Sequence, residues 1–413
     1  MLPARLRNAA LVLVAFVASA HAVWCYGLPS GALLIAIVAL GAWYVVLGAA
    51  GALVVTASLV LGTLALWGAI EVAGLERAIY YRPHEMLEVL DTDWGRRYKA
   101  RQRVVMKDSF GDLAAIDHIG FRELREVEFV TDALGFRNRA DYDGRAWVLL
   151  GDSMVAGAGN TQDCLLSETL ARRHGIGAYT LAHPGDGLPD YEARLRTLQR
   201  LRGDGVRALA FVYEDNDFLP YRPASYRKRA AFRRYEAWLR DHALYRYTRS
   251  LYVRAFKRAN YGKVTVKPVA GGPMAFMPSY VEVVRNARPL EEGTLGFGPA
   301  LAAMRPGLAH VFFVPGKYRV YGPLAGAGAA PLPHAQWEYL ERAAKAAGVP
   351  ATDLTPALVA RARELAGAGR TVFWRDDSHW NCEGTAVVAA EVTRALGGAK
   401  PAPPAERVPA RAP

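Results

Sequence analysis

The chain has 413 residues, a net charge of +12 and 52% hydrophobic residues. That length leaves room for a membrane segment plus one or two globular domains. Three cysteines are too few for a protein held together by a disulfide framework. Cys164 and Cys382 could pair in an oxidising compartment, but two buried free thiols are the favoured interpretation.

The first 75 residues are strongly apolar. No Asp, Glu, Lys or Arg occurs between Arg7 and Glu71, and one helical span needs roughly 20 apolar residues, so two or three membrane spans are expected. They are predicted at Ala9 to Tyr26, Ala32 to Leu47 and Ala52 to Ile70. The first also resembles a cleavable signal peptide, but a retained helix is favoured because further apolar spans follow directly. Both interpretations place the large domain on the periplasmic side of the cytoplasmic (inner) membrane, whereas only two retained spans would leave it in the cytoplasm.

The rest of the chain predicts one α/β domain behind a linker. Residues 76–131 are charged and mixed, which favours a juxtamembrane linker. Residues 132–397 alternate short apolar runs with helical patterns, which is typical of a doubly wound, three-layer α/β/α fold with a parallel sheet. The expected strands are Ala146–Leu150, Ala178–Ala182, Ala208–Tyr213 and His310–Val314. The expected helices are Leu165–His174, Tyr191–Leu201, Trp337–Ala347, Ala357–Ala366 and Glu383–Leu396. Residues 398–413 are rich in Pro, Ala and Arg and are predicted to be disordered.

A basic insertion interrupts this alternation at residues 221–267. It holds fourteen Lys and Arg against two acidic residues, so it accounts for the whole positive excess of the chain. One interpretation is a helical insertion that packs its aromatic residues on the domain and leaves its charges in solvent. The other is a surface for anionic lipid or acidic polysaccharide, to which Arg227 and Arg233 would contribute. We do not expect nucleic acid as a partner. A Gly/Pro-rich loop is expected at residues 268–278.

Two motifs at opposite ends of the α/β domain suggest acyl-transfer chemistry. Ser153 follows an apolar run and a Gly-Asp pair, so its hydroxyl is expected at the carboxyl end of the sheet, where α/β folds place their chemistry. His379 has Asp377 and Asp376 two and three positions before it. A serine hydroxyl becomes a good nucleophile when a base takes its proton, and the base needs a third group to fix its tautomer.

Two further loops are expected at the same edge of the sheet. Gly185 follows the second predicted strand and Asn216 follows the third. With the backbone N–H of Ser153 they could supply three donors to a developing oxyanion. Lys317 follows the fourth strand and could bind an anionic substrate, although a solvated loop lysine is an equally good interpretation.

These four blocks resemble the SGNH (GDSL-type) hydrolase family in their order along the chain: Gly151-Asp152-Ser153, Gly185, Asn216-Asp217, and Asp376 to His379. The run Asp377-Ser378-His379-Trp380-Asn381 also resembles the Asp-x-His-Trp motif of the alginate O-acetylation branch. The resemblance implies that Ser153 is the nucleophile, that His379 is the base, and that Asp376 or Asp377 orients the histidine. Asp377 is preferred because Trp380 and Asn381 match that branch.

The resemblance implies a membrane-anchored serine esterase or O-acyltransferase, with O-acetyl groups on a cell-envelope glycan as the substrate. A small ester could also serve, and an acyl-donor membrane protein is a further expected partner. No cofactor and no metal are expected. Two alternatives stay open at this point: a non-catalytic glycan-binding or assembly protein on the same fold, and an esterase acting on membrane lipid.

Overall fold

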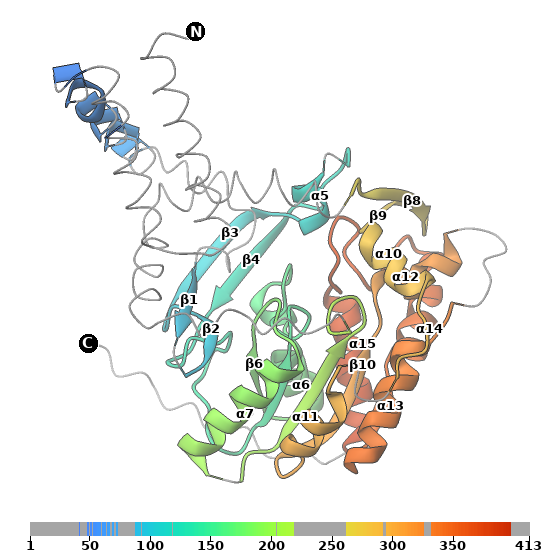
Figure 1. Cartoon of the computed structure of the whole chain (residues 1–413). Coiled ribbons are helices and arrows are strands. Elements are labelled where there is room, and N and C mark those ends of the chain that lie inside the picture. The colour runs from blue at the N-terminus through green and yellow to red at the C-terminus, as the bar shows by residue number, and fades with distance from the viewer. Residues whose placement is uncertain are drawn as a thin grey trace, which may run out of the picture. The chain divides into compact units, whose positions relative to one another are not determined.

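The computed structural model describes residues 87–397 except 92, 118, 204, 219–261, 292–294 and 326–331, together with scattered residues between 41 and 72. The chain divides into two compact units, one of residues 1–79 and 228–248 and the other of residues 80–227 and 249–413. The larger unit contains every numbered strand and helix named below (Figure 1).

A five-stranded parallel sheet forms the centre of the larger unit, in the order β11-β10-β7-β5-β6. The strands are β5 (Trp147–Gly151), β6 (Ala178–Ala182), β7 (Ala208–Tyr213), β10 (Leu308–Val314) and β11 (Ala351–Asp353). Leu150 on β5 is paired with Leu181 on β6 and with Ala210 on β7. Such continuous apolar runs are expected when both faces of a parallel sheet are covered.

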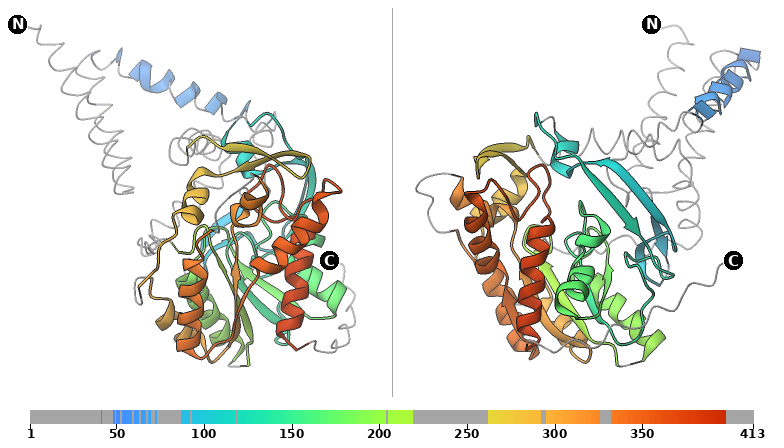
Figure 2. Two further views of the ribbon diagram at one scale, coloured as in Figure 1. Left: turned by 90° about the vertical axis from the view of Figure 1, so that its right-hand side faces the viewer. Right: turned by 180° about the vertical axis from the view of Figure 1, so that it is seen from behind.

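Helices cover both faces of this sheet (Figure 2). They are α6 (Leu166–His174), α7 (Leu188–Arg202), α10 (Pro278–Arg285), α11 (Phe297–Met304), α12 (Lys317–Tyr321), α13 (Ala335–Ala347), α14 (Thr355–Ala366) and α15 (Cys382–Ala395), with 3₁₀ turns η1 (Gln162–Cys164) and η3 (Gly322–Leu324). Val148 and Leu150 pack with residues of α7, α11 and α13. Leu149 packs with residues of α6, α14 and α15 on the other face. This alternation along one strand produces the three layers.

The α/β fold is confirmed, and the four predicted strands and five predicted helices are all present with ends shifted by at most three residues. The fifth strand, β11, was not predicted. It has only three residues, all of them partly buried, and therefore lacks the long apolar run that marks the other four.

Residues 88–130 differ from the expected linker, because they are folded. They form two antiparallel hairpins, β1 (Glu88–Asp91) with β2 (Gly95–Tyr98) and β3 (Arg103–Ser109) with β4 (Arg125–Val130), and the short helix α5 (Asp112–Ile116) between β3 and β4. On β4 the charged residues alternate with buried Val127 and Phe129. A one-sided strand of this kind has a high charge content, which is why composition alone favoured a linker.

A second difference occurs where the Gly/Pro-rich loop was expected. Strands β8 (Thr265–Val269) and β9 (Gly272–Phe276) form a tight antiparallel hairpin. Ala270 and Gly271 join them, both with positive φ, of 48° and 73°. Two consecutive residues in that region give the turn that best matches the twist of a hairpin.

Most of the predicted membrane segment and most of the basic insertion lie outside the described residues. Those described between Gly48 and Val72 are helical. Within the described part of the chain, no helix combines the length and apolar character needed to cross a membrane. The tail at residues 398–413 also lies outside it.

Candidate active site

Ser153 lies where the sequence predicted, directly after β5 at the carboxyl edge of the sheet. In the observed strand order, β6 lies on one side of β5 and β7 lies on the other. The chain therefore passes from β5 to β6 on one side and then crosses back to β7 on the other side. Ligands of open α/β sheets bind at this switch point. The Ser153 hydroxyl is partly buried and donates a hydrogen bond to Asp152 Oδ2 at 3.2 Å.

Asp152 joins the ends of β5 and β7 beneath this serine. Its carboxylate is buried and accepts hydrogen bonds from the Met154 N–H at 2.9 Å and from Asn216 Nδ2 at 2.8 Å. Burial raises the pKa of Asp152 above its usual value, and the Asn216 hydrogen bond and the nearby His379 oppose that shift. The histidine block lies against the loop that follows Ser153, because a Cβ atom at Gly159 in that loop would lie 2.9 Å from Asp377 Oδ2.

His379 is held by Asp377, two residues before it. The imidazole Nδ1 lies 2.5 Å from Asp377 Oδ1, and the His379 backbone N–H donates to the same oxygen at 3.2 Å. Both residues are buried. A carboxylate at Nδ1 fixes the proton on that nitrogen and leaves Nε2 to act as a base. The geometry therefore favours Asp377 as the residue that orients His379.

Asp376 instead connects the histidine block to the folded segment before β4. Its Oδ2 accepts the backbone N–H groups of Gly111 at 2.8 Å and of Glu123 at 3.0 Å, and its Oδ1 pairs with Arg125 at 3.0 Å. At Gly111 a side chain would collide with the Asp376 backbone, so only glycine allows this close approach.

Arg125, the first residue of β4, was missed by the sequence reasoning. Its guanidinium donates to Asp377 Oδ2 at 2.9 Å as well as to Asp376, and it lies 4.2 Å from the ring centroid of Trp374. Asp377 thus holds His379 with one oxygen and Arg125 with the other. A single arginine in a segment predicted to be a linker carries no local signal for this role.

The proposed oxyanion donors lie at the expected edge. Gly185 follows β6 with φ of +76°, and its carbonyl accepts a hydrogen bond from Arg96. Asn216 follows β7 and uses one of its amide N–H groups on Asp152. The oxyanion role of Ser153, Gly185 and Asn216 remains a prediction.

Lys317 is placed differently from a substrate-binding lysine. It is buried at the start of α12, and its ammonium donates to the backbone carbonyls of Trp374 at 2.7 Å, Arg375 at 3.0 Å and Asp377 at 2.9 Å. An ammonium has three N–H groups, so these bonds occupy all of them. Lys317 therefore supports the loop that carries Asp377. The other two suggested substrate contacts, Arg227 and Arg233, lie outside the described residues.

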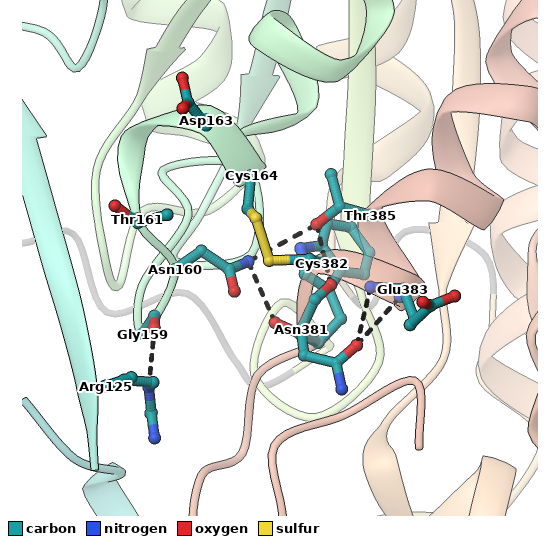
Figure 3. The surroundings of a disulfide bond; sticks show 12 residues. Arg125, Gly159, Asn160, Thr161, Asp163, Cys164, Asn381, Cys382, Glu383 and Thr385 are labelled. Carbon is teal, nitrogen blue, oxygen red and sulfur yellow. Dashed lines mark hydrogen bonds between the residues drawn. A yellow bond between two sulfur atoms is a disulfide. The ribbon is translucent and has the colours of Figure 1, made fainter. Parts of the chain in front are cut away.

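A disulfide connects the serine and histidine blocks, so the free-thiol interpretation was wrong. Cys164 and Cys382 are bonded across 218 residues, with their Cα atoms 5.0 Å apart (Figure 3). Asn160 reinforces the connection, because it donates to the Trp380 carbonyl at 3.1 Å and accepts from Trp374 Nε1 at 2.9 Å. The pairing was not decidable from the sequence, because it depends on the start of α15 lying beside the turn before α6.

The cap of α15 also aligns the histidine block. The Asn381 side chain accepts the backbone N–H groups of Glu383 at 3.0 Å and Gly384 at 3.2 Å, which satisfies two of the free donors of the first turn (Figure 3). Helix α15 therefore begins at a defined residue, three positions after His379.

Comparison with known proteins gives a match in the C-terminal part of the chain. Residues 305–411 match the family model described as the SGNH hydrolase-like domain of the acetyltransferase AlgX. No curated protein matches the chain. The match spans β10, α15 and the histidine block between them, the part of the chain that carries the Asp-x-His-Trp motif. Residues 305–411 of this chain are thus similar to the SGNH hydrolase-like domain of the acetyltransferase AlgX.

Proposed function

We propose that this protein is a serine-dependent O-acyltransferase or esterase that moves acetyl groups on an extracytoplasmic glycan. The observation that carries the proposal is the Asp377–His379 pair, 2.5 Å apart, in a block that the Cys164–Cys382 disulfide links to the segment after Ser153. The AlgX-type match over residues 305–411 supports acetyl as the group transferred and a glycan as its acceptor.

In the proposed reaction, Ser153 Oγ attacks the carbonyl carbon of an acetyl ester while its proton passes to His379 Nε2. The tetrahedral intermediate collapses, its bond to the donor oxygen breaks, and His379 returns the proton to that leaving oxygen. An acceptor hydroxyl then attacks the carbonyl carbon of the acetyl-serine while its proton passes to His379. The bond from that carbon to Ser153 Oγ breaks, and His379 returns the proton to Oγ. Asp377 stabilises the imidazolium formed in each half-reaction.

Donors near the developing oxyanion would lower the barrier of both steps. The backbone N–H groups of Ser153 and Gly185 and the amide of Asn216 are the proposed donors, each worth roughly 3 kcal/mol where such groups have been removed from other enzymes. The acceptor determines the reaction type: a sugar hydroxyl gives transfer, and water gives hydrolysis.

The extracytoplasmic location is part of the proposal. A disulfide between Cys164 and Cys382 is stable in an oxidising compartment and is unusual in the cytosol. The apolar residues 9–70 would anchor the protein in the inner membrane, where a membrane protein could supply the acyl group.

The direct test is labelling of the purified protein with an alkyl fluorophosphonate. We expect one adduct on Ser153, with none on Ser153→Ala and slow labelling of His379→Ala. Each variant should keep the thermal midpoint of the wild type to within a few degrees. Labelling of Ser153→Ala at the wild-type rate would refute the assignment of the nucleophile.

A second assay separates the reaction types. With a small acetyl ester as donor, we expect acetate release in buffer and acetylated product when an acidic oligosaccharide is added. Binding of the oligosaccharide with neither labelling nor acetate release would instead indicate a non-catalytic glycan-binding protein. Preference for a vesicle-bound lipid ester would indicate a lipid esterase.

A further inference from the structure

A second carboxylate lies beside the His379–Asp377 pair and has no part in the mechanism described so far. Asp112, the first residue of α5, is buried, and its Oδ2 lies 4.0 Å from His379 Nδ1. It reaches this position from 267 residues earlier in the chain, out of the segment between β3 and β4 (Figure 1).

Ser378 connects Asp112 to the imidazole. Asp112 Oδ1 accepts the Ser378 backbone N–H at 2.8 Å, and Asp112 Oδ2 accepts the Ser378 hydroxyl at 2.6 Å. Because that hydroxyl donates to Asp112, its lone pairs are left for other donors, and its oxygen lies 3.3 Å from His379 Nδ1. The Nδ1–H therefore faces the Asp377 carboxylate and a serine oxygen made more negative by Asp112.

We propose that Asp112, acting through the Ser378 hydroxyl, is a second positioning carboxylate for His379. The proposal rests on the function proposed above, in which His379 is the base. Asp112 orients the Ser378 hydroxyl so that its oxygen faces Nδ1, and its negative charge stabilises the imidazolium that forms when Ser153 loses its proton.

The surrounding groups are consistent with an electrostatic role. Among the groups near His379, Asp377 and Ser378 come from its own loop and Asp112 from α5, and Asp152 at the end of β5 interacts electrostatically with it. Arg125 donates a hydrogen bond to the Asp377 carboxylate, and Lys317 donates one to the Asp377 backbone carbonyl. Burial, and next the charge of Asp112, raises the pKa of Asp377, so the two carboxylates affect each other directly.

The segment that carries Asp112 has other attachments to the domain. Asp376 binds Gly111 and Glu123, and at the far end of α5 Asp117 accepts the backbone N–H of Val264 at 3.1 Å. Loss of the Asp112 charge therefore leaves α5 attached. Asp117→Asn is the matched control, because it removes a buried carboxylate of the same segment that accepts a hydrogen bond from Val264.

Asp112→Asn tests the charge at constant shape. One amide oxygen can still accept from Ser378, but the amide nitrogen must then donate where an oxygen accepted, which turns the Ser378 hydroxyl around. We expect the NMR titration midpoint of the His379 imidazole, measured in a Ser153→Ala background, to fall by roughly one pH unit, since a lost opposite charge at this distance has an effect of that size.

The same variants are then measured with Ser153 present. We expect Asp112→Asn and Ser378→Ala each to slow fluorophosphonate labelling at neutral pH on the order of tenfold, and the double variant to be no slower than either, because both remove one connected interaction. The acid limb of the labelling rate should move to lower pH in all three. Asp117→Asn should match the wild type in both measurements.

The outcomes separate this proposal from the proposed function. An unchanged His379 midpoint in Asp112→Asn, with Ser153 still labelled normally, would overturn the role of Asp112 and leave the nucleophile intact. If the His379 midpoint falls in Asp112→Asn but Ser153 of the wild type is not labelled, the electrostatic role of Asp112 is supported and the catalytic function is refuted. If Asp112→Asn fails to fold, the Ser378→Ala midpoint decides: a lowered midpoint supports the proposal, and an unchanged one overturns it.

Discussion

Asp376 and Asp377 are adjacent in sequence but contact different partners. Asp377 bonds to the imidazole of His379 and to Arg125, whereas Asp376 accepts two backbone N–H groups of the segment before β4. Asp376 lies in a turn and Asp377 at a bend, and their side chains reach different partners, so one carboxylate can serve the site and the other the fold.

Substitution of the two aspartates by asparagine should therefore have different effects. We expect Asp377→Asn to lower the turnover number by about 10³- to 10⁴-fold with little change in unfolding, because it favours the wrong histidine tautomer. Asp376→Asn should instead lower the free energy of unfolding by roughly 1–3 kcal/mol, the cost of an unsatisfied buried donor. Steady-state rates and urea unfolding of both variants check this, and a larger rate loss in Asp376→Asn would transfer the orienting role.

The buried Lys317 should make the stability of the fold depend on pH. Burial lowers the pKa of Lys317 to about 7, although the carboxylates of Asp377 and Asp376 oppose the shift. The folded state therefore gives up this proton near pH 7, whereas an unfolded chain keeps it to about pH 10.4. Between these values the unfolded state binds more protons, so the contribution of Lys317 to stability rises with pH.

We expect the free energy of unfolding of the wild type, relative to Lys317→Met, to increase between pH 7 and pH 9 by at most about 1.4 kcal/mol per pH unit. Urea unfolding at the two pH values measures the difference. A constant difference would mean that the three carbonyl acceptors keep the ammonium charged. Since Lys317 contacts no substrate in our assignment, turnover should change in Lys317→Met more than KM does.

Among the elements, α15 depends on a long-range covalent link. The bond between Cys164 and Cys382 closes a loop of 218 residues. Closing so long a loop reduces the entropy of the unfolded chain by an amount worth up to about 5 kcal/mol, although strain and residual structure often reduce the measured figure. The link also lies three residues beyond His379, so it supports the site as well as the fold.

Removal of the disulfide should weaken both the fold and the site. We expect Cys164→Ser with Cys382→Ser to lower the free energy of unfolding by roughly 2–5 kcal/mol and to slow Ser153 labelling at 37 °C. Cys25→Ser is the control, since Cys25 is not one of the bonded pair and should leave both quantities unchanged. Equal urea midpoints for the oxidised and reduced wild type would contradict the prediction.

The hairpin of β3 and β4 is the other element that the site requires. It carries Arg125, and the turn region between its strands carries Asp112. Both side chains contact the histidine block from a segment some 250 residues earlier. The α/β domain from residue 132 onward is therefore not expected to retain activity when residues 88–130 are removed.

For the whole molecule, the location of the catalytic unit is the main open prediction. The apolar residues 9–70 and the disulfide both favour a periplasmic domain on an inner-membrane anchor. A pair of reporters fused after Leu396, alkaline phosphatase and a cytoplasm-specific fluorescent protein, tests it. We expect activity only of the phosphatase, and fluorescence alone would place the unit in the cytoplasm and remove the envelope glycan as substrate.

Much of this protein could be predicted from local sequence patterns. The strands β5, β6, β7 and β10 are apolar runs buried on both faces, so hydrophobicity alone locates them. Ser153 and His379 could be identified because each stands in a short motif next to a strand or helix boundary. The expected order of strands and helices then brings both motifs to one edge of the sheet.

The contacts that complete the site were decided by the tertiary structure. Arg125, Asp112 and the Cys164–Cys382 bond each join residues more than 200 positions apart, and no local pattern encodes such a pairing. A strand with one charged face, such as β4, has the composition of a linker. Only the packing of its other face in the folded structure distinguishes the two. Lys317 shows the same limit: a lysine in a loop is equally suited to solvent, substrate or backbone carbonyls, and only the approach of residues 374–377 selects the last.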